Sequence, residues 1–170
     1  MDKPLRSLSR KNWINRALQK LTDEGIDKVS IAALARDLSV TKGSFYWHFK
    51  DVPDFKTKML HHWQSSVIGA LTAAVDAGGT ASQRLYRINE IASTDSGSFG
   101  GAALEPAIRA WAQSDVEVAD AIEEIDAKRM ASLAATLKQL ALRISLIESR
   151  LVFDSGEERL PVLQTSKVHS

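Results

Sequence analysis

The 170-residue chain is 44% hydrophobic, carries 22 Lys or Arg against 21 Asp or Glu, and contains no cysteine. This composition is typical of a globular protein with a core, and it excludes a disulfide framework or a thiolate metal site. No apolar run approaches the roughly 20 residues that span a bilayer, and no apolar core follows the charged N-terminus, so we expect a cytoplasmic protein with no membrane partner.

The net charge of +1 conceals an uneven distribution. Residues 1–60 contain 12 Lys or Arg against 7 Asp or Glu, net +5, and the remainder contains 10 against 14, net −4. Cations that bind a phosphate backbone release counterions, so a basic N-terminal third favours binding to nucleic acid. We expect the acidic remainder not to touch DNA.

The first third has the pattern of three short helices after a basic arm at residues 1–8. Ser9 is placed to cap the first helix and Gly25 to end it. Ser30 is placed to cap the second. A break at residues 39–41 follows, and a third helix is expected from Thr41, as its cap, to Phe49. The inward faces of the three helices are expected to carry Trp13, Ile14, Ala17, Leu18 and Leu21, then Ile31, Leu34, Ala35 and Leu38, then Phe45, His48 and Phe49.

The outward residues of the third helix are hydroxyls, one cation, one glycine and two amphipathic rings. Such groups hydrogen-bond phosphates and base edges, and a glycine lets two backbones approach closely. The set comprises Thr41, Lys42, Gly43, Ser44, Tyr46 and Trp47. The alternative interpretation is that both rings are half-buried packing residues and the lysine a solvated charge.

Residues 31–51 closely resemble the DNA-binding domain of the tetracycline-repressor (TetR) family of bacterial transcription regulators. The most specific part is Gly-Ser-Phe-Tyr-Trp-His-Phe-Lys at residues 43–50. Two positions depart from the family pattern. Ser39 stands where Gly is usual in the turn, and Val52 where a second Lys or Arg is common.

The resemblance implies that the third helix of each subunit enters a major groove of a palindromic operator. Lys42 and Gly43 are then expected at base edges, and Thr41, Tyr46 and Trp47 at the DNA backbone and thymine methyls. Contacts to phosphates are expected from Ser30, Lys50 and Lys56. Ser44 and His48 complete the expected DNA-binding set.

Helical periodicity continues through the rest of the chain. A long helix is expected from about Asp54 to Ala77, with Pro53 at its start and Gly78 and Gly79 after its end. Further helices are expected over 82–92 and 104–113, joined by a loop at 93–101 that lacks the residues of a phosphate-binding loop or a nucleophile elbow. A capping box at Ser114 and Glu117 then opens a helical pattern to Ile147, which allows a break near Ala141.

The expected fold is all-α. Its parts are a helix-turn-helix domain at 1–52, a helical effector-binding and dimerisation domain at 53–153, and an irregular tail at 154–170. The resemblance extends to about Leu140, and family members usually end with two long helices that pair with those of a partner. This chain has room for about one, so we expect a C-terminally shortened protein with a reduced or weak dimer interface from Ala127 to Leu151.

For the second domain, the two alternatives are a packed core without a ligand and a pocket for a small hydrophobic effector. The candidate pocket residues are Trp63, Phe99, Trp111, Ile122 and Met130, although such residues at helical spacing more often form core. No metal site or cofactor is expected, because the adjacent His61 and His62 point about 100° apart on a helix. No arrangement of side chains supports catalysis, so an enzyme is not expected.

Two functions remain for this sequence. The first is a homodimeric DNA-binding regulator, a repressor that a small effector releases from its operator. The second is a helical interaction protein of the same fold that has lost operator binding or induction.

Overall fold

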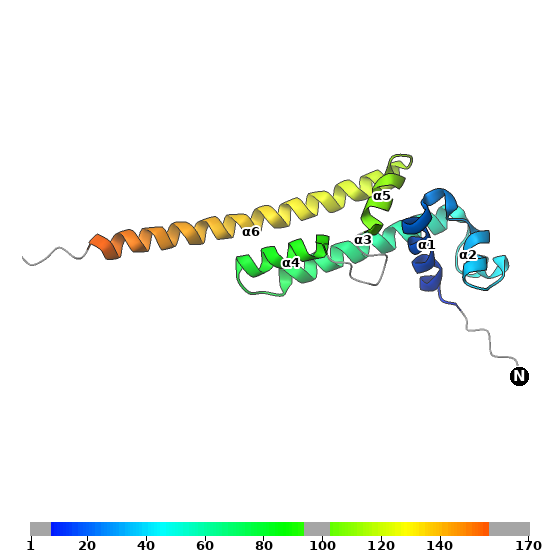
Figure 1. Cartoon of the computed structure of the whole chain (residues 1–170), viewed down its shortest axis with the longest axis horizontal. Coiled ribbons are helices and arrows are strands. Elements are labelled where there is room, and N and C mark those ends of the chain that lie inside the picture. The colour runs from blue at the N-terminus through cyan, green and yellow to red at the C-terminus, as the bar shows by residue number, and fades with distance from the viewer. Residues whose placement is uncertain (1–7, 94–102, 157–170) are drawn as a thin grey trace, which may run out of the picture.

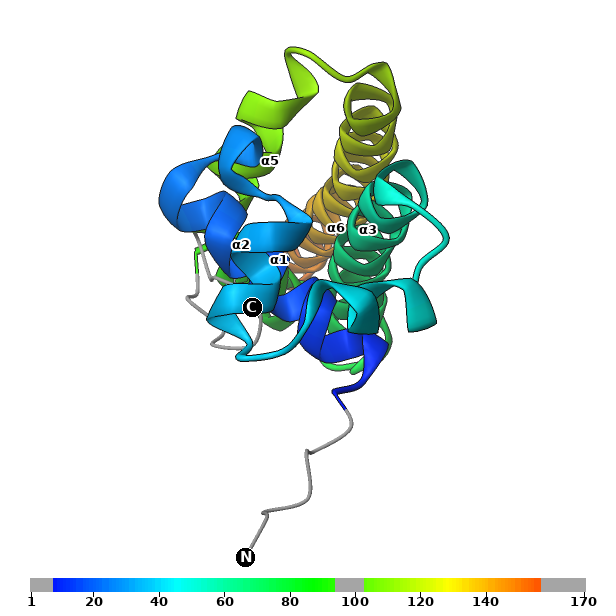
Figure 2. The same ribbon diagram turned by 90° about the vertical axis from the view of Figure 1, so that its right-hand side faces the viewer.

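The computed structural model describes residues 8–93 and 103–156, and these residues form helices joined by short turns (Figure 1). The predicted all-α fold is therefore confirmed. In chain order the elements are α1 (Arg10–Glu24), the 3₁₀-helix η1 (Ile26–Lys28), α2 (Ile31–Asp37), the 3₁₀-helix η2 (Lys42–Trp47), α3 (Val52–Asp76), α4 (Ala81–Ser93), α5 (Leu104–Ala112) and α6 (Val116–Gly156). Figure 2, viewed from the N-terminal end, shows α1 and α2 in front of α3 and α6.

Local signals set the ends of the first helices. The Ser9 hydroxyl accepts a hydrogen bond from the Asn12 backbone N–H, and the Ser9 backbone N–H donates to the Asn12 side-chain oxygen at 2.9 Å, which closes a capping box. Gly25 follows α1 with φ of 85°, where a side chain would be strained. Ser30 caps α2 by accepting from the Ala33 N–H. These three capping predictions are confirmed.

The turn after α2 is a Schellman motif centred on Ser39. The Val40 N–H donates to the Ala35 carbonyl at 2.9 Å, and the Ser39 N–H donates to the Arg36 carbonyl at 3.1 Å. This pattern requires a left-handed residue, and Ser39 has φ of 57°. The turn therefore has the conformation in which glycine is usual, although serine occupies the left-handed position.

The third predicted helix is shorter and tighter than expected. η2 covers Lys42–Trp47 rather than Thr41 to Phe49, and it contains i to i+3 hydrogen bonds, such as that from the Ser44 N–H to the Thr41 carbonyl at 3.1 Å. Thr41 makes no side-chain cap, so its predicted capping role is wrong. Gly43 weakens the α-helix here, and the short segment is held by its buried ring, Phe45, instead of by its own propensity.

The aromatic rings of the head pack around Phe45, which is fully buried. Its ring centroid lies 5.4 Å from that of Trp13, 4.9 Å from Phe49 and 5.3 Å from Phe55. Such edge and tilted contacts stabilise beyond simple burial of apolar area. Because Phe55 belongs to α3, this cluster fixes the head directly to the helix that leads into the body.

α3 begins two residues earlier than predicted. The Asp51 side chain accepts from the Asp54 N–H and caps the helix, with Pro53 in its first turn. The helix ends before Gly78 and Gly79, both of which have positive φ. The expected domain boundary at residue 52 falls at the first residue of α3, which continues from the head into the body.

α4 and α6 pack on α3, and α5 packs on α1 and α6. The predicted loop at 93–101 falls on residues that, beyond Ser93, lie outside the described part of the chain. The predicted capping box at Ser114 is wrong, because α6 begins at Val116 and the Ser114 hydroxyl donates to the Trp111 carbonyl at 3.2 Å. The carboxylate of Asp115 instead accepts from the Trp111 indole N–H at 3.1 Å.

The buried residues of the head and of α5 and α6 form one continuous core. It includes Trp13 of α1, Met59 of α3, Ile108 of α5 and Val118 of α6, each fully buried. α5 packs against α1 on one side and against α6 on the other. A displacement of α5 would therefore change the packing of α1 in the head.

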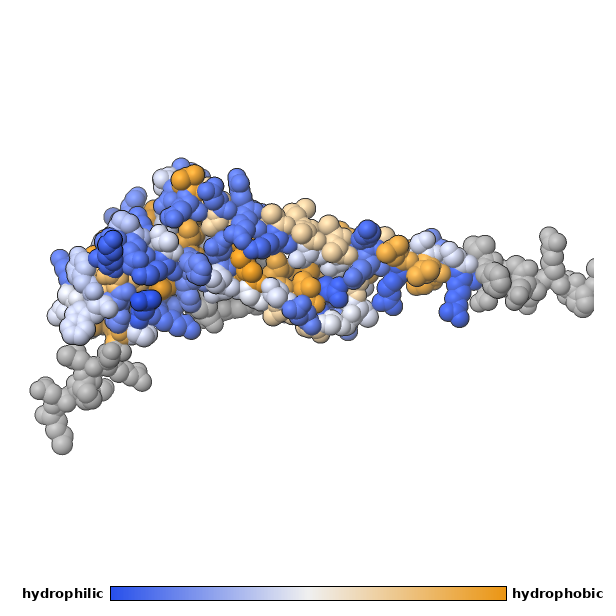
Figure 3. All heavy atoms as spheres, turned by 180° about the vertical axis from the view of Figure 1, so that it is seen from behind, coloured by the Kyte–Doolittle hydropathy of each residue, from blue (hydrophilic) through white to orange (hydrophobic). Residues whose placement is uncertain are grey.

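α6 is a single helix of 41 residues, about 60 Å long at 1.5 Å per residue. The expected break near Ala141 is absent from it, and residues 154–156, assigned to the irregular tail, are helical. The rest of that tail, 157–170, lies outside the described residues. All side chains from 141 to 151 are exposed, so this half of α6 projects from the body (Figures 1 and 3).

By length and composition, α6 between Val116 and Leu151 could cross a membrane, which the sequence had not led us to expect. One such helix is weak support for a membrane protein. The first half of α6 is part of the core described above, with Val118 and Ile125 almost fully buried. The 18-residue stretch of α6 that meets the length and composition test is only 6% buried, so packing within the chain does not explain its apolar character.

Candidate nucleic-acid interface and apolar groove

Ion pairs hold α2 against α1 and so fix the helix-turn-helix. Asp37 at the end of α2 accepts from the Arg16 guanidinium at 2.7 and 3.0 Å, and Lys20 lies 3.4 Å from the same carboxylate. The hydrogen bond from Arg16 lowers the pKa of Asp37 below its usual value. The turn that follows, with Ser39, is thereby tied to α1.

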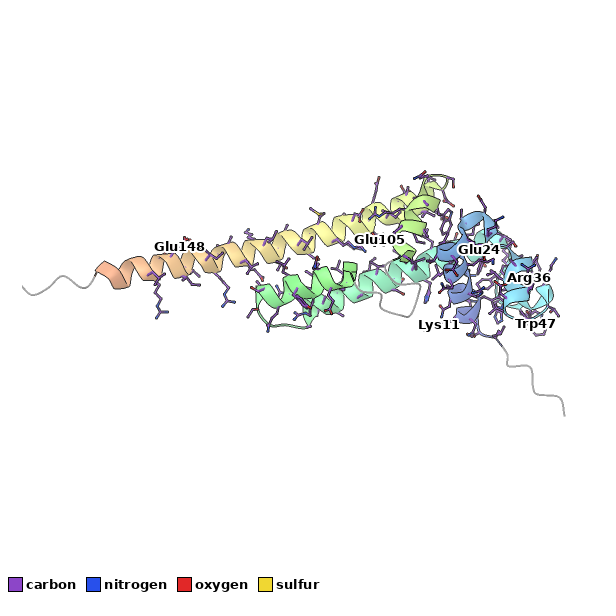
Figure 4. The ribbon with its side chains drawn as sticks, viewed as in Figure 1. Lys11, Glu24, Arg36, Trp47, Glu105 and Glu148 are labelled. Carbon is purple, nitrogen blue, oxygen red and sulfur yellow. The ribbon has the colours of Figure 1, made fainter. Side chains whose placement is uncertain are left out.

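The outward side of η2 is exposed, although its inward side is buried. Trp47 is 88% exposed and Tyr46 is 60% exposed, whereas Phe45 between them and the core is fully buried. Two adjacent exposed aromatic side chains form an apolar patch, which is the kind of surface feature that marks an interaction site. Figure 4 places Trp47 at the outer end of the head together with Arg36 of α2, away from α6.

Four of the residues expected at DNA meet in one hollow between η1, η2 and the start of α3. Ser30, Lys42, Tyr46 and Lys56 line a depression of about 590 Å³. Two ammonium groups, a phenol and a hydroxyl suit the oxygen atoms of a phosphate or sugar. The Lys56 ammonium also lies 6.0 Å from the centre of the Trp111 ring, so it sits where head and body meet.

Ile26, Asp27 and Val29 also line this hollow, and sequence reasoning did not single them out. The signal that could have found them is Gly25. A glycine with positive φ after α1 turns the chain into η1, which brings these residues beside η2.

The remaining expected DNA contacts lie outside the hollow. Thr41 and Gly43 are exposed, and a Cβ built on Gly43 would come no closer than 3.7 Å to another residue. The Ser44 hydroxyl donates to the Thr41 carbonyl at 2.8 Å, and His48 is half-buried with its ring 6.2 Å from that of Phe49. Lys50 is exposed, and its backbone N–H donates to Asp54 at 3.0 Å.

A second hollow, the apolar groove, lies in the body between α3, α4 and α6. Its volume is about 570 Å³, within the range of small-molecule sites. It is lined by Val67, Leu71, Ser82, Leu85, Tyr86, Ile88, Asn89, Ile91, Arg129 and Leu133. Arg129 is the one charged side chain among these lining residues.

The residues expected to line an effector pocket are elsewhere. Trp63, Trp111 and Ile122 are buried in the core, and Met130 is 65% exposed and is not among the groove-lining residues. Phe99 lies outside the described residues. The signal that could have found the groove was the helical spacing of Leu85, Ile88 and Asn89 on α4.

A cluster of four charged side chains joins α5 to α6 beside the groove. Arg129 donates to both carboxylate oxygens of Glu105, at 2.7 and 2.6 Å, and Arg109 donates to the same carboxylate at 2.8 Å. Arg109 also binds Asp126, at 2.9 and 3.0 Å. The hydrogen bonds from Arg129 and then Arg109 lower the pKa of Glu105 to about 2. Glu105 is therefore an anion at any physiological pH.

Within the described residues, no group of three or more His, Asp or Glu side chains could hold a metal ion. His61 is exposed and forms a 3.3 Å contact with the Ser65 hydroxyl one turn along α3. His62 is half-buried, and burial lowers its pKa below the usual value.

Comparison with known proteins finds that the head is similar to one family of regulators. Residues 14–51 match the family of bacterial regulatory proteins called the tetR family. The chain is 29% identical over 59 residues to the HTH-type transcriptional regulator AcrR of Shigella flexneri. That match covers 35% of this chain and 27% of the relative, so the chain spans about a quarter of the relative's length.

Two crystal structures share the fold over a larger part of the chain. One is a proposed transcriptional regulator from Saccharomonospora viridis in complex with choline, with a TM-score of 0.64 and 16% identity, covering 88% of this chain and 86% of that one. The other is a proposed transcriptional regulator from Streptomyces coelicolor, with a TM-score of 0.58 and 16% identity, covering 75% of each chain. The predicted resemblance is therefore confirmed by the match of the head and by the shared fold.

Proposed function

We propose that the chain, whose residues 14–51 match the tetR family of bacterial regulatory proteins, regulates transcription by binding an operator as a homodimer. The observation that carries the proposal is the exposed side of η2. Trp47 and Tyr46 are exposed there, and Lys42 and Lys56 flank the same surface. An aromatic and cationic surface on a rigid head suits a major groove and its phosphates.

In this proposal, Lys42 and Gly43 meet base edges, and Thr41, Tyr46 and Trp47 meet the DNA backbone and thymine methyls. Ser30, Lys50 and Lys56 bind phosphates. Ser30 also caps α2, because its hydroxyl accepts a hydrogen bond from the Ala33 N–H at 3.3 Å. Ser44 and His48, both half-buried on this segment, complete the proposed DNA-binding set.

Two lysine substitutions separate base reading from phosphate binding. Lys42→Ala should relax base preference and weaken binding to a selected operator by roughly 1–3 kcal/mol per subunit. Lys50→Ala should weaken all duplexes alike and make the dependence of affinity on salt less steep. Lys138→Ala on the exposed surface of α6 is the control, and it should change neither the base preference nor the salt dependence of binding. Titration of each variant with operator and with unrelated duplexes, at several salt concentrations, gives the affinities. Unchanged binding by both Lys42→Ala and Lys50→Ala would contradict the proposed docking.

Dimerisation is proposed through the projecting half of α6. Leu137, Ile144, Ile147 and Leu151 are between 52% and 64% exposed, and with Leu140 they follow the alternating three- and four-residue spacing of a coiled-coil seam. A second copy of the chain would cover this face. The two heads would then reach successive major grooves of a near-palindromic operator.

The apolar groove is the proposed effector site. It is formed by α3, α4 and α6, and α3 continues directly from the head, so a ligand bound there can favour one placement of the heads over another. A ligand that favours the wrong spacing lowers operator affinity by its differential binding energy, which would make the protein a repressor released by its effector.

The neighbour in complex with choline supports the idea that this fold holds small molecules, but choline itself does not suit this groove. A quaternary ammonium group is recognised by several aromatic faces or by carboxylates. The groove has one aromatic lining residue, Tyr86, which is 68% exposed, and no lining carboxylate.

A further inference from the structure

The chemistry of the apolar groove narrows the ligand class that it can take. Nine of its ten lining residues are uncharged, and the exception is Arg129. A guanidinium pairs best with a planar carboxylate, which it can bind through two parallel hydrogen bonds. The remaining walls, formed by side chains such as Leu71, Ile88 and Leu133, suit an apolar tail.

We infer that the groove binds an apolar molecule carrying one carboxylate, which takes the place of Glu105 on Arg129 and so loosens the link between α5 and α6. This inference deepens the proposed function and rests on it, because it assigns the effector class and the step that carries its signal.

The charge cluster beside the groove makes this exchange feasible. Glu105 holds Arg129 through both of its oxygens, but it also accepts from Arg109 at 2.8 and 3.2 Å. When a ligand carboxylate takes Arg129, Glu105 keeps Arg109 as its partner. A buried carboxylate without a cation would be strongly destabilising, and the exchange leaves none.

The position of Glu105 gives the exchange a route to the head. Glu105 lies in the first turn of α5, near the meeting point of α5 and α6 (Figure 4). On the same helix, Ile108 and Trp111 are buried in the core that contains Trp13 of α1, and α5 packs directly against α1. Arg109 still binds Asp126 of α6 after the exchange, so the first turn of α5 is loosened and not detached, and this change acts on a helix that contacts the DNA-binding head.

The test uses three probes with the same tail: octanoate, 1-octanol and octyltrimethylammonium. Calorimetric titration of the full chain, without DNA, gives the affinity for each. We expect octanoate to bind several-fold more tightly than octanol, less than a wholly new ion pair would give because its carboxylate must displace Glu105, and octyltrimethylammonium to bind most weakly. Equal binding of octanoate and octanol, tightest binding of the ammonium probe, or no binding of any probe would overturn the inference.

Two substitutions separate the proposed exchange from a merely structural effect. Arg129→Gln and Glu105→Gln both break the same ion pair, so a structural role would make them act alike. We expect Arg129→Gln to remove the preference for octanoate, and Glu105→Gln, which removes the competing carboxylate, to raise octanoate affinity several-fold without changing that of octanol. Weaker octanoate binding by Glu105→Gln would overturn the exchange.

Arg84→Gln is the matched control. Arg84 lies on α4, donates to the Gln139 side chain at 2.7 Å and is absent from the groove lining, so its loss should leave the octanoate preference in place. If this substitution abolishes the preference and Arg129→Gln does not, the assignment to Arg129 is overturned. Operator binding is measured separately without a probe, so failure of the proposed function is distinguished from failure of the ligand assignment.

Discussion

At the scale of single residues, the turn of the helix-turn-helix contains a built-in strain. Ser39 is left-handed, with φ of 57°, and it is the one non-glycine residue with positive φ in the described part of the chain. A left-handed conformation costs a residue with a Cβ about 1–2 kcal/mol. Within the described residues its hydroxyl makes no hydrogen bond that would offset this cost.

We therefore expect Ser39→Gly to raise the free energy of unfolding by up to about 1 kcal/mol, since part of the relief is lost to the larger entropy of an unfolded glycine. Ser39→Ala keeps the Cβ and should give no gain. Urea unfolding of the three proteins measures both effects. A less stable glycine variant would mean that Ser39 contributes a contact that this account lacks.

The roles of single residues at helix ends were predictable from the sequence where the interaction lies within one turn of the chain. Ser9, Ser30 and Gly25 act within one turn of a helix end, so their roles follow from residue type and spacing. Thr41 and Ser114 resemble such caps equally well, yet Thr41 makes no side-chain cap and Ser114 bonds to Trp111 instead. Their surroundings are set by tertiary packing that sequence spacing does not contain.

At the scale of elements, α5 is held in place by one carboxylate that serves two helices. Glu105 binds Arg129 of α6 and Arg109 of its own helix, and this pairing lowers its pKa to about 2. A carboxylate with a depressed pKa in the folded state stabilises the fold above its unfolded pKa, near 4.5. That contribution is lost as the pH falls from about 4.5 towards 2.

The difference in stability between the natural chain and Glu105→Gln should follow this pH window. We expect the variant to be less stable by about 1–3 kcal/mol above pH 5, because Arg129 loses its carboxylate, and the difference to shrink as the pH falls towards 2. Thermal unfolding at several pH values gives the comparison. A difference that does not depend on pH would contradict the role of the ionised carboxylate.

Element positions were predictable where apolar spacing is regular and long. α1, α3, α4 and α5 lie within a few residues of their predicted ranges, because each buries one periodic face. η2 was predicted as an ordinary helix, yet it is a 3₁₀-helix held by Phe45 packing on Trp13 and Phe55. The groove was missed because its walls come from three helices whose registry the sequence does not give.

At the scale of the whole molecule, the projecting half of α6 is the feature that most needs a partner. Its exposed apolar side chains, among them Ile144, Ile147 and Leu151, recur at alternating three- and four-residue spacing. Figure 3 shows hydrophobic patches along this half of the helix. An exposed helix of this kind is poorly stable by itself in water. Pairing with a second copy would bury the seam and position two heads.

A charge placed in that seam should prevent pairing. We expect Ile144→Glu to shift the chain from dimer to monomer by at least about tenfold in dissociation constant, because the carboxylate would be buried against apolar side chains. Ser145→Glu adds the same charge beside the seam and should have little effect. Size-exclusion chromatography with light scattering reports the mass, and equal behaviour of the two variants would contradict this interface.

The central claim, a dimer that binds an operator, is tested most directly by sedimentation equilibrium of the purified chain with and without a duplex selected from random sequence, at one moderate salt concentration. The account predicts a dimer that selects a near-palindromic duplex and sediments with it as a two-chain complex. A monomer that selects no sequence would contradict it, and the chain would then be a helical interaction protein that keeps the fold of the family without its operator binding.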